Sequence, residues 1–247
     1  VVYKWDYQVE KKLVKSSSSG GHIDGTCVSQ LDNILCFGDS LTSVSFCHLN
    51  RETLKISEFA RDFQDNYITS LQLIDHSSVI AADLTGNLMT FQVIRDEALD
   101  MNAAICEGNI HLGDQINKIL PGDLRIHPTQ AQKSFIAVSS TGSLYALHKI
   151  ESDLYKKLSR LQKNLLTLLK PIGGIKHADF RKFYNGERTM KASQAFIDGD
   201  LLIRFTGLSL KSKQEVLGLA SKSTSAEKIG FTIEEATQII ESLSYGI

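Results

Sequence analysis

The sequence lacks the features that mark nucleic-acid-binding, membrane-spanning and nucleotide-binding proteins. Its 247 residues carry 27 basic and 28 acidic side chains, spread along the chain, for a net charge of −1. Because no electrostatic footprint for nucleic acid stands out, we expect contact with DNA or RNA only indirectly, through a bound partner. The apolar runs are too short to span a bilayer, so no membrane partner is expected. The chain also contains neither a P-loop nor a GxGxxG motif, the Gly-rich loops that hold phosphates.

The sequence is also poor in metal-binding and disulfide patterns. Its four cysteines show no CxxC spacing, which argues against a zinc knuckle and against a disulfide framework: Cys27, Cys36, Cys47 and Cys106. We expect buried free thiols in a reducing compartment. The seven histidines show no His-x-x-x-His spacing: His22, His48, His76, His111, His127, His148 and His177. Neither a metal nor a cofactor is therefore expected.

The chain does contain a repeated phrase: an apolar strand, a tight polar turn with Gly, and an alternating strand. It occurs at residues 33–39, 79–87 and 135–143, and the second and third copies align without gaps. This spacing is typical of β-propeller blades, which stack on one another because one blade cannot bury both of its faces. Three blades do not close a ring, so either chain outside this sequence supplies the missing blades or the open edges are paired or covered. We expect the sequence to be a piece of a longer protein.

Most of the remaining strand candidates before residue 150 alternate apolar and polar side chains, as half-buried antiparallel strands do. They cover residues 42–49, 54–59, 68–74, 88–93, 116–120 and 144–150. Residues 16–21 read as a Ser/Gly loop, and residues 95–109 as a polar connector.

The pattern becomes helical at Glu151. Five leucines recur at helical spacing before Pro171 ends the run: Leu154, Leu158, Leu161, Leu165 and Leu168. Asp198 and Asp200 can cap a second helix through Leu208, and Ser209 a third through about Ala220. Thr232 and Glu235 form a capping box for a last helix, with Gly246 placed to terminate it. The predicted fold is mainly β with α: the last blades of a WD40-like propeller over residues 1–150, then a small helical C-terminal domain over 151–247.

Two motifs suggest chemistry and are better explained by structure. Gly38-Asp39-Ser40-Leu41 spells the signature of GDSL esterases, but the Asp-x-x-His that supplies their base does not follow Ser40. A blade turn that contains Ser explains it. Asp198-Gly199-Asp200 resembles a metal-binding DxD, but no acidic cluster flanks it and a helix start accounts for both carboxylates. We therefore expect no enzyme, with ester hydrolysis by Ser40 as a distant alternative.

Several segments resemble one known family in order and at compatible spacing. They are Phe37-Gly38-Asp39, residues 58–63 (Glu-Phe-Ala-Arg-Asp-Phe), His111-Leu112-Gly113, and residues 195–201 (Ala-Phe-Ile-Asp-Gly-Asp-Leu). Together they closely resemble the C-terminal region of the large subunit of UV-damaged DNA-binding protein, the adaptor of cullin-4 ubiquitin ligases. Relatives in that family serve pre-mRNA cleavage and splicing complexes. The Ala-Arg-Asp-Phe block favours the ligase adaptor.

The resemblance implies a non-catalytic scaffold in which other propellers of the same chain complete a pocket for WD40-type substrate receptors. Cullin-4 would bind a propeller outside this segment. The positions that match the receptor pocket are Thr26, Cys27, Tyr67, Gln115 and Asn117. The structural family motif is Phe196, Ile197, Asp198, Gly199, Asp200 and Leu201.

This sequence departs from the family pattern in the pocket. Thr26-Cys27 replaces an aliphatic-aromatic pair, Tyr67 an indole and Gln115 an aromatic, which predicts a smaller, more polar pocket. These departures suggest a divergent fungal paralogue that serves a heterochromatin-directed ligase. The resemblance implies a nuclear location and leaves the cytoplasm open as a second. The roles implied are DNA repair or chromatin silencing, and the alternative is a structural subunit of a pre-mRNA cleavage or splicing complex.

Overall fold

The computed structural model describes residues 1–7, 11–18, 20–96, 101–124, 133–191, 195–219 and 229–244. The strands are β1 Val2–Trp5, β2 Leu13–Ser17, β3 Gly25–Leu31, β4 Ile34–Asp39, β5 Ser43–Leu49, β6 Ile56–Arg61, β7 Ile68–Leu73, β8 Ser78–Asp83, β9 Asn87–Asp96, β10 Met101–His111, β11 Ile116–Pro121, β12 Ser134–Ser139, β13 Leu144–His148, β14 Phe183–Tyr184 and β15 Thr189–Met190. The helices are α1 Ser152–Leu168, α2 His177–Phe180, α3 Gly199–Leu202, α4 Leu210–Val216 and α5 Ile233–Ser244, with 3-10 turns η1 Ile172–Gly174 and η2 Ile203–Phe205.

The chain divides into two compact units. The blade unit comprises Val1–Ile119, Val138–Ser143 and Phe183–Thr189, and the helical unit comprises Leu120–Ala137, Leu144–Lys182 and Met190–Ile247. The division runs through the third of the large sheets, which has the strand order β11-β12-β13. The predicted boundary between residues 150 and 151 stays a prediction.

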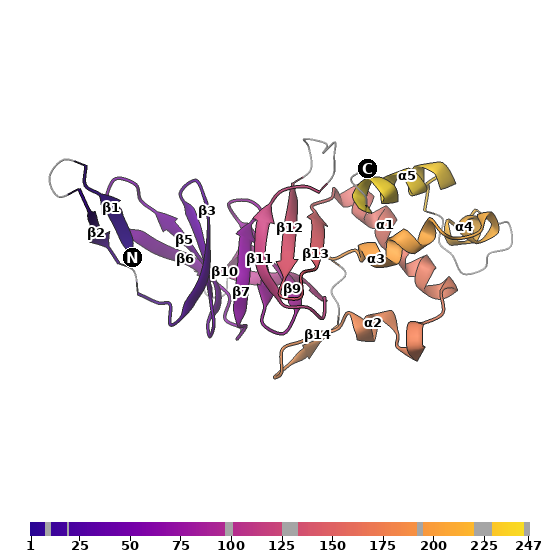
Figure 1. The fold of residues 1–247 in the computed structure, drawn as a ribbon, viewed down its shortest axis with the longest axis horizontal. Helices are drawn as coiled ribbons and strands as arrows, with labels where there is room; N and C mark the ends of the chain where they lie inside the picture. The colour runs from indigo at the N-terminus through magenta and orange to yellow at the C-terminus, as the bar shows by residue number, and fades with distance from the viewer. Residues whose placement is uncertain are drawn as a thin grey trace. The chain divides into compact units, whose positions relative to one another are not determined.

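The predicted fold class is confirmed: the structure is mainly β with a set of helices (Figure 1). Two antiparallel sheets have four strands each, in the orders β3-β4-β5-β6 and β7-β8-β9-β10. The three copies of the repeated phrase fall on β4, β8 and β12 with the turns that follow them. Each copy is therefore the second strand of one blade, and the four-stranded sheets are built in the sequential order of propeller blades.

A side chain at the end of each of these second strands closes the turn that follows. Asp83 Oδ1 accepts hydrogen bonds from the backbone N–H groups of Thr85 and Asn87, both at 2.9 Å. Asp39 does the same in the first copy, and Ser139 Oγ accepts from the Ser143 N–H at 3.0 Å in the third. Short polar side chains favour such turns because they replace backbone partners that the strand no longer supplies.

The first two blades pack face to face because Gly38 has no side chain. A Cβ built there would lie 2.6 Å from both Cys27 Sγ and Ile68 Cγ2, which is closer than real Cβ contacts. Next to this contact, Thr26 Oγ1 donates to the carbonyl oxygen of Ile68 at 2.6 Å. Buried apolar side chains fill the interior of the two blades, among them Val44, Phe46, Ile68, Leu71, Val79, Leu88 and Phe91.

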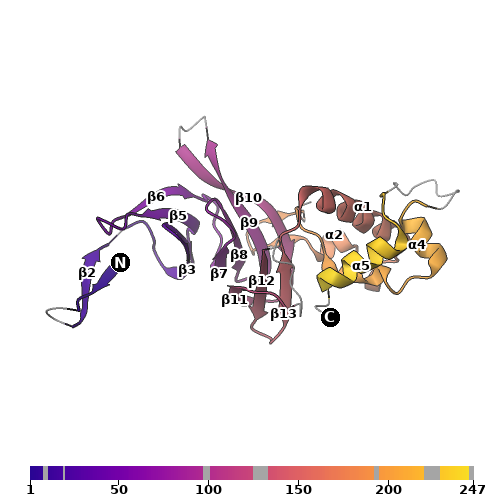
Figure 2. The same ribbon diagram turned by 90° about the horizontal axis from the view of Figure 1, so that it is seen from above.

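Two predictions of loops are wrong, because residues in both segments form strands. Residues 101–109, expected within a polar connector, belong to β10, which pairs with β9 from Asp96↔Met101 to Asn87↔His111 as a long hairpin (Figure 2). Ser16 and Ser17, expected in a loop, lie in β2, which pairs with β1. In both cases backbone pairing with a neighbouring strand forms the ladder, and side-chain composition does not reveal it.

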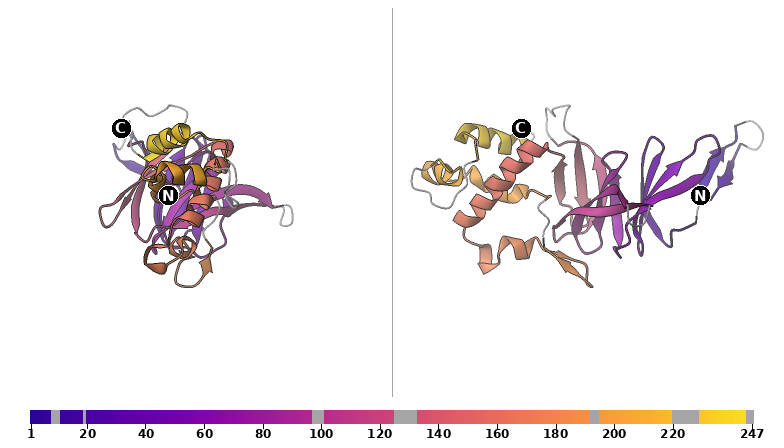
Figure 3. Two further views of the ribbon diagram at one scale, coloured as in Figure 1. Left: turned by 90° about the vertical axis from the view of Figure 1, so that its right-hand side faces the viewer. Right: turned by 180° about the vertical axis from the view of Figure 1, so that it is seen from behind.

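The helical unit is organised around α1, whose leucine stripe is buried as predicted. Its core comprises Leu158, Leu161, Leu165, Leu202, Phe205, Val216, Leu217, Ile229, Phe231, Ala236 and Ile240. Helix α3 contacts both α1 and α5, and α1 also contacts α4; Figure 3 shows the ribbon of these helices from two sides. In the described residues no helix is long and apolar enough to cross a membrane.

The predicted caps of this unit are confirmed, but two helices are shorter than expected. Thr232 N–H donates to Glu235 Oε2 at 2.8 Å, and Glu235 N–H donates to Thr232 Oγ1 at 3.1 Å, which is a complete capping box. Ser209 caps α4, which ends at Val216. The helix after Asp198 ends at Leu202 and continues only as a 3-10 turn. Ala220 and Gly246 lie outside the described residues.

Candidate functional site

The five predicted receptor-binding residues lie at the beginnings of three strands that are first in their sheets. Thr26 and Cys27 are the second and third residues of β3, Tyr67 directly precedes β7, and Gln115 and Asn117 flank the first residue of β11. Threonine hydroxyls join these strands in order: Thr26 bonds to the carbonyl of Ile68, and Thr69 bonds to that of Ile116 at 2.7 Å. The structure therefore brings the five residues to one rim of the blade unit.

Thr26 and Cys27 form a tightly bonded part of this rim. The Thr26 hydroxyl lies 2.6 Å from the Ile68 oxygen and 3.1 Å from the Gly38 oxygen, so its proton is already used within the fold. Cys27 is half-buried beside Gly38, and burial raises the pKa of its thiol. These side chains can offer surface and hydroxyl lone pairs to a partner, but no reactive thiolate.

Tyr67 is the largest exposed side chain among the five, with 45% of its area accessible. Its carbonyl oxygen accepts from the Leu84 N–H at 3.0 Å, which fixes its backbone. The residue before it, Asn66, is almost completely buried and donates to Asp62 Oδ2 at 3.1 Å. A tyrosine on a fixed backbone with an accessible ring is well suited to anchor a partner, since it offers apolar area and a hydroxyl together.

The segment before Tyr67 is anchored by the β14–β15 hairpin, which sequence reasoning did not predict. Arg188 donates to Asn66 Oδ1 at 2.7 Å and also to Gln64 Oε1. The Asn185 side chain donates to the Asp65 carbonyl at 3.2 Å. These partners are more than 115 positions apart in the sequence, and no local pattern signals such contacts.

Asp62 is the buried acid of this network. Ser43 Oγ donates to its Oδ2 at 2.7 Å, in addition to the bond from Asn66. Burial raises the pKa of Asp62, and the bonds from Ser43 and the Gln64 N–H with the charge of Arg188 oppose the rise without cancelling it. The network therefore depends on neutral donors more than on an ion pair.

Gln115 and Asn117 occupy the third strand of the rim. The Gln115 carbonyl accepts from the Ser140 N–H at 2.8 Å, which ties it to the turn of the third repeated phrase. Asn117 is exposed and follows Ile116, as Thr69 follows Ile68. Because Thr69 bonds to the next blade, Asn117 stands at the position that would meet whatever adjoins the third sheet.

Ser40, the candidate esterase nucleophile, is bonded to an acid. It is 8% exposed, and its Oγ donates to Asp24 Oδ2 at 3.0 Å. Within the described part of the chain, the structure gives it no contact with a histidine. With its hydroxyl donated to Asp24 and no histidine beside it in the described residues, Ser40 lacks the base of an esterase, which agrees with the interpretation as a blade turn.

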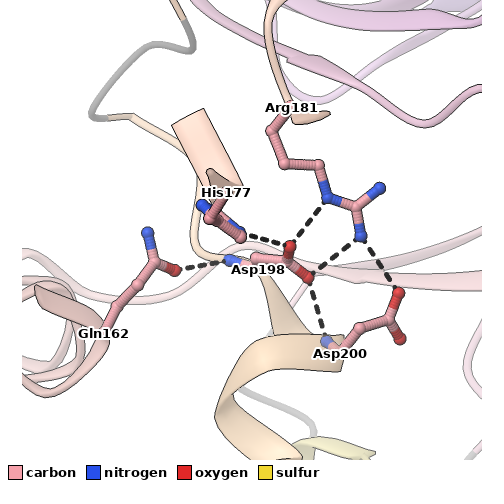
Figure 4. A network of polar contacts seen from close by, with 5 residues as sticks. All are labelled: Gln162, His177, Arg181, Asp198 and Asp200. Atoms are coloured by element: carbon pink, nitrogen blue, oxygen red, sulfur yellow. Dashed lines mark hydrogen bonds and ion pairs between the residues drawn. The ribbon is translucent and has the colours of Figure 1, made fainter. Parts of the chain in front are cut away.

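Asp198, the central acid of the structural family motif, is a buried ion-pair partner in the helical unit (Figure 4). Its Oδ2 accepts from Arg181 Nε at 2.7 Å and from His177 Nε2 at 2.8 Å. Its Oδ1 accepts from the Asp200 N–H at 3.0 Å, which confirms the predicted helix cap. Gln162 Oε1 accepts from the Asp198 N–H at 2.8 Å.

These bonds determine the charge of Asp198. Burial would raise its pKa, but the hydrogen bonds from His177 and Arg181 and their charges outweigh burial and hold the pKa well below the ordinary value. Since both carboxylate oxygens already have partners, the motif is structural and does not offer a cation site. Sequence reasoning found the cap but missed Arg181 and His177 as its partners.

The other members of the structural family motif divide between core and surface. Leu201 is buried, and Ile197 packs against the helical core. Phe196 is half-buried, whereas Gly199 and Asp200 are exposed.

Comparison with known proteins places this architecture in a family. The family model described as "CPSF A subunit region" matches residues 1–207, so the chain belongs to that family. Within it, the chain is a C-terminal region like that of DNA damage-binding protein 1. It is 27% identical over 251 residues to that protein of Oryza sativa subsp. japonica, and the match covers 98% of this chain.

Other relatives carry the same name. The chain is 28% identical over 247 residues to DNA damage-binding protein 1 of Solanum lycopersicum and 26% identical over 246 residues to DNA damage-binding protein 1a of Arabidopsis thaliana. Each match covers 96% of this chain and 22% of the relative. The chain thus spans about a fifth of the length of these proteins.

Proposed function

We propose that this chain is the receptor-docking end of a cullin-4-type ubiquitin ligase adaptor. The observation that carries the proposal is the rim, where three neighbouring strands begin and where Tyr67 and Asn117 are exposed on fixed backbone. Family membership supports a non-catalytic scaffold. The names of the relatives support a role in DNA repair, to which we add the nucleus as the place of action and chromatin silencing as the alternative role.

The proposed mechanism is passive docking of a helical segment of a WD40-type receptor. The favourable binding free energy would come from burying the Tyr67 ring and from a few oriented hydrogen bonds. For these bonds the Asn117 side chain offers both a donor and an acceptor. Thr26 and Cys27 would form a small wall beside them. With a net charge of −1, the chain carries no excess of the positive charge that DNA binding requires, so DNA contact is assigned to the receptor.

The test is receptor capture by the full-length protein with Tyr67→Ala or Asn117→Ala. We expect Tyr67→Ala to weaken receptor binding by about 30-fold or more, as loss of an interface anchor worth about 2 kcal/mol does. Tyr7→Ala is the matched control, because Tyr7 is an aromatic of the same type with 79% of its area exposed away from the rim strands. Unchanged receptor capture by both rim variants would refute the docking site.

Mass spectrometry of the captured proteins separates the proposal from its alternative. Cullin and WD40-type receptors support the adaptor. Recovery of pre-mRNA cleavage or splicing factors in their place would overturn it in favour of a structural subunit of those complexes.

A further inference from the structure

Three potential metal ligands converge on one face of the first blade, in a region that the proposed docking rim does not use. They are the His22 imidazole, the Cys47 thiol and the Glu58 carboxylate, and their ligand atoms all lie within 4.8 Å of one another. All three belong to the blade unit. The sequence spacing of these residues fits no metal motif, so only the fold reveals the group.

Strand register brings two of the three together. Cys47 on β5 is paired directly with Glu58 on β6, so their side chains project from the same face of the sheet. Cys47 is fully buried, while Glu58 is partly exposed. A buried thiol beside a carboxylate is unfavourable as a pair of anions, and burial together with the charge of Glu58 raises the pKa of Cys47 to about 12.

The loop before β3 supplies the third group. Gly21 has a φ of +109°, a backbone conformation that L side chains rarely adopt, and it directs the chain past Glu58. The His22 ring that follows packs against Phe37, with ring centroids 4.8 Å apart and the ring planes tilted by 38°. Both ring nitrogens lie 3.4 Å from Ser45 Oγ, at the outer limit for a hydrogen bond, so among the described residues the imidazole lone pair has no strong partner.

Arg61 holds the loop and the carboxylate in place. The same guanidinium nitrogen donates to Glu58 Oε2 at 2.7 Å and to the Gly21 carbonyl at 3.0 Å. A donor that orients a ligand carboxylate from behind is the usual second layer of a metal site. Glu58 keeps its other oxygen for an ion.

We infer that His22, Cys47 and Glu58 form a zinc-binding site with one coordination position left open. A thiolate, an imidazole and a carboxylate are the donors that Zn²⁺ prefers, and three protein ligands leave the fourth tetrahedral position for water or another ligand. With bonds of about 2.0–2.3 Å, ligand atoms around zinc are about 3.5 Å apart, so the group must close by about 1 Å.

Of the three proposed ligands, Glu58 borders a groove through which solvent can reach it. Glu58 and Arg61 line a groove of about 690 Å³ together with Gly21 and Phe63. As zinc binds, the Cys47 S–H bond is replaced by a Zn–S bond and the proton passes to solvent, which balances the step.

The test measures zinc binding by the metal-stripped full-length protein, in competition with a chromophoric chelator, and compares variants. We expect Cys47→Ser to remove one bound zinc per chain. His22→Ala and Glu58→Gln should weaken that binding at least about 10–100-fold, the loss that even outer-layer substitutions cause. With Co²⁺ as the probe, the thiolate-to-cobalt charge-transfer band should disappear in Cys47→Ser.

Cys36→Ser and His48→Ala are the matched controls. Cys36 is as fully buried as Cys47 but is paired with Phe46, and its side chain projects from the opposite face. His48 is the exposed neighbour of Cys47. Both should bind zinc as the wild type does.

Equal zinc stoichiometry in the wild type and Cys47→Ser would overturn the site, as would absence of tightly bound zinc from the wild type. If Cys47→Ser fails to fold, the partly exposed His22 and Glu58 decide the question: unchanged binding in both of their variants also refutes it. The result is independent of receptor capture.

Discussion

Asp62 in the blade unit and Asp198 in the helical unit are buried to a similar degree, and the two acids are stabilised in opposite ways. In the helical unit, Asp198 accepts from Arg181 and His177, and its pKa is held well below the ordinary value. In the blade unit, Asp62 accepts mainly from neutral groups, and burial raises its pKa. Similar burial therefore gives opposite results because only Asp198 has cations in direct contact.

This difference fits the role of each region. The Arg181–Asp198 pair joins α2 to the start of α3 and fixes how the helical unit is assembled. The Asp62 network holds the segment that presents Tyr67. Hydrogen bonds from neutral donors have weaker electrostatics than an ion pair. Every polar group of the Asp62 network must nevertheless stay hydrogen-bonded, because a buried polar group without a partner is costly.

The largest expected effect is loss of the buried ion pair. Asp198→Ala would leave Arg181, whose side chain is only 7% exposed, without its main partner. We expect the free energy of unfolding to fall by about 3–5 kcal/mol, measured by denaturant titration of the full-length protein. Asp200→Ala is the control, because Asp200 also contacts Arg181 but its side chain is 85% exposed. If Asp198→Ala lowers the free energy of unfolding no more than Asp200→Ala does, the proposed difference between the two buried acids is wrong.

The next effect concerns the blade unit. Arg188→Ala would remove the bond to Asn66 and the charge that faces Asp62. We expect a loss of about 1–3 kcal/mol and faster amide hydrogen exchange in residues 183–189. Arg51→Ala, which removes an exposed arginine that donates to the Asp32 carbonyl, should change neither. Unchanged exchange in the hairpin would contradict the anchoring role of Arg188.

The pH dependence of stability should separate the two acids. Because the folded-state pKa of Asp198 is depressed, its contribution is complete above the ordinary value of 3.8 and is lost as pH falls toward the folded value. The loss should approach about 1.4 kcal/mol per pH unit for one proton. Asp62 has the opposite sign, since protonation relieves its burial. In Asp198→Asn the decline in acid should become shallower, and an identical acid limb would refute this assignment.

The smallest effect is expected for Asp62→Asn. The amide keeps the shape of the side chain and removes a charge that burial disfavours, so we expect a change of at most about 1 kcal/mol. Asp62→Ala, which leaves Ser43 and Asn66 without their acceptor, should cost more. Equal costs for the two variants would show that the charge itself matters, and the contrast with Asp198 would then need revision.

The periodic features of the chain could be predicted from sequence because they follow from local geometry. The leucine stripe of α1 reports its buried face, and the Thr232–Glu235 capping box involves residues three positions apart. The repeated phrase gave the second strand of each blade. The β10 strand was missed because hairpin pairing depends on a partner strand more than on its own composition.

The candidate sites were recoverable only in part. The resemblance indicated the rim residues. The structure shows in addition that the Thr26 hydroxyl donates its hydrogen bond to a carbonyl of the next blade. Neither Arg188 beside Asn66 nor Cys47 beside His22 has any local signature. Such contacts join segments whose proximity depends on how strands and loops pack.

The order of residues alone therefore indicated most of the elements of this protein: where most strands alternate, where the blade turns close and where the capped helices begin. Tertiary structure decided which side chains meet, and with that the charge of each buried acid and the composition of each site. The physical reason is the separation along the chain over which each interaction acts. Hydrophobic periodicity and capping act over a few residues, whereas burial and ion pairing depend on neighbours that only the folded chain supplies.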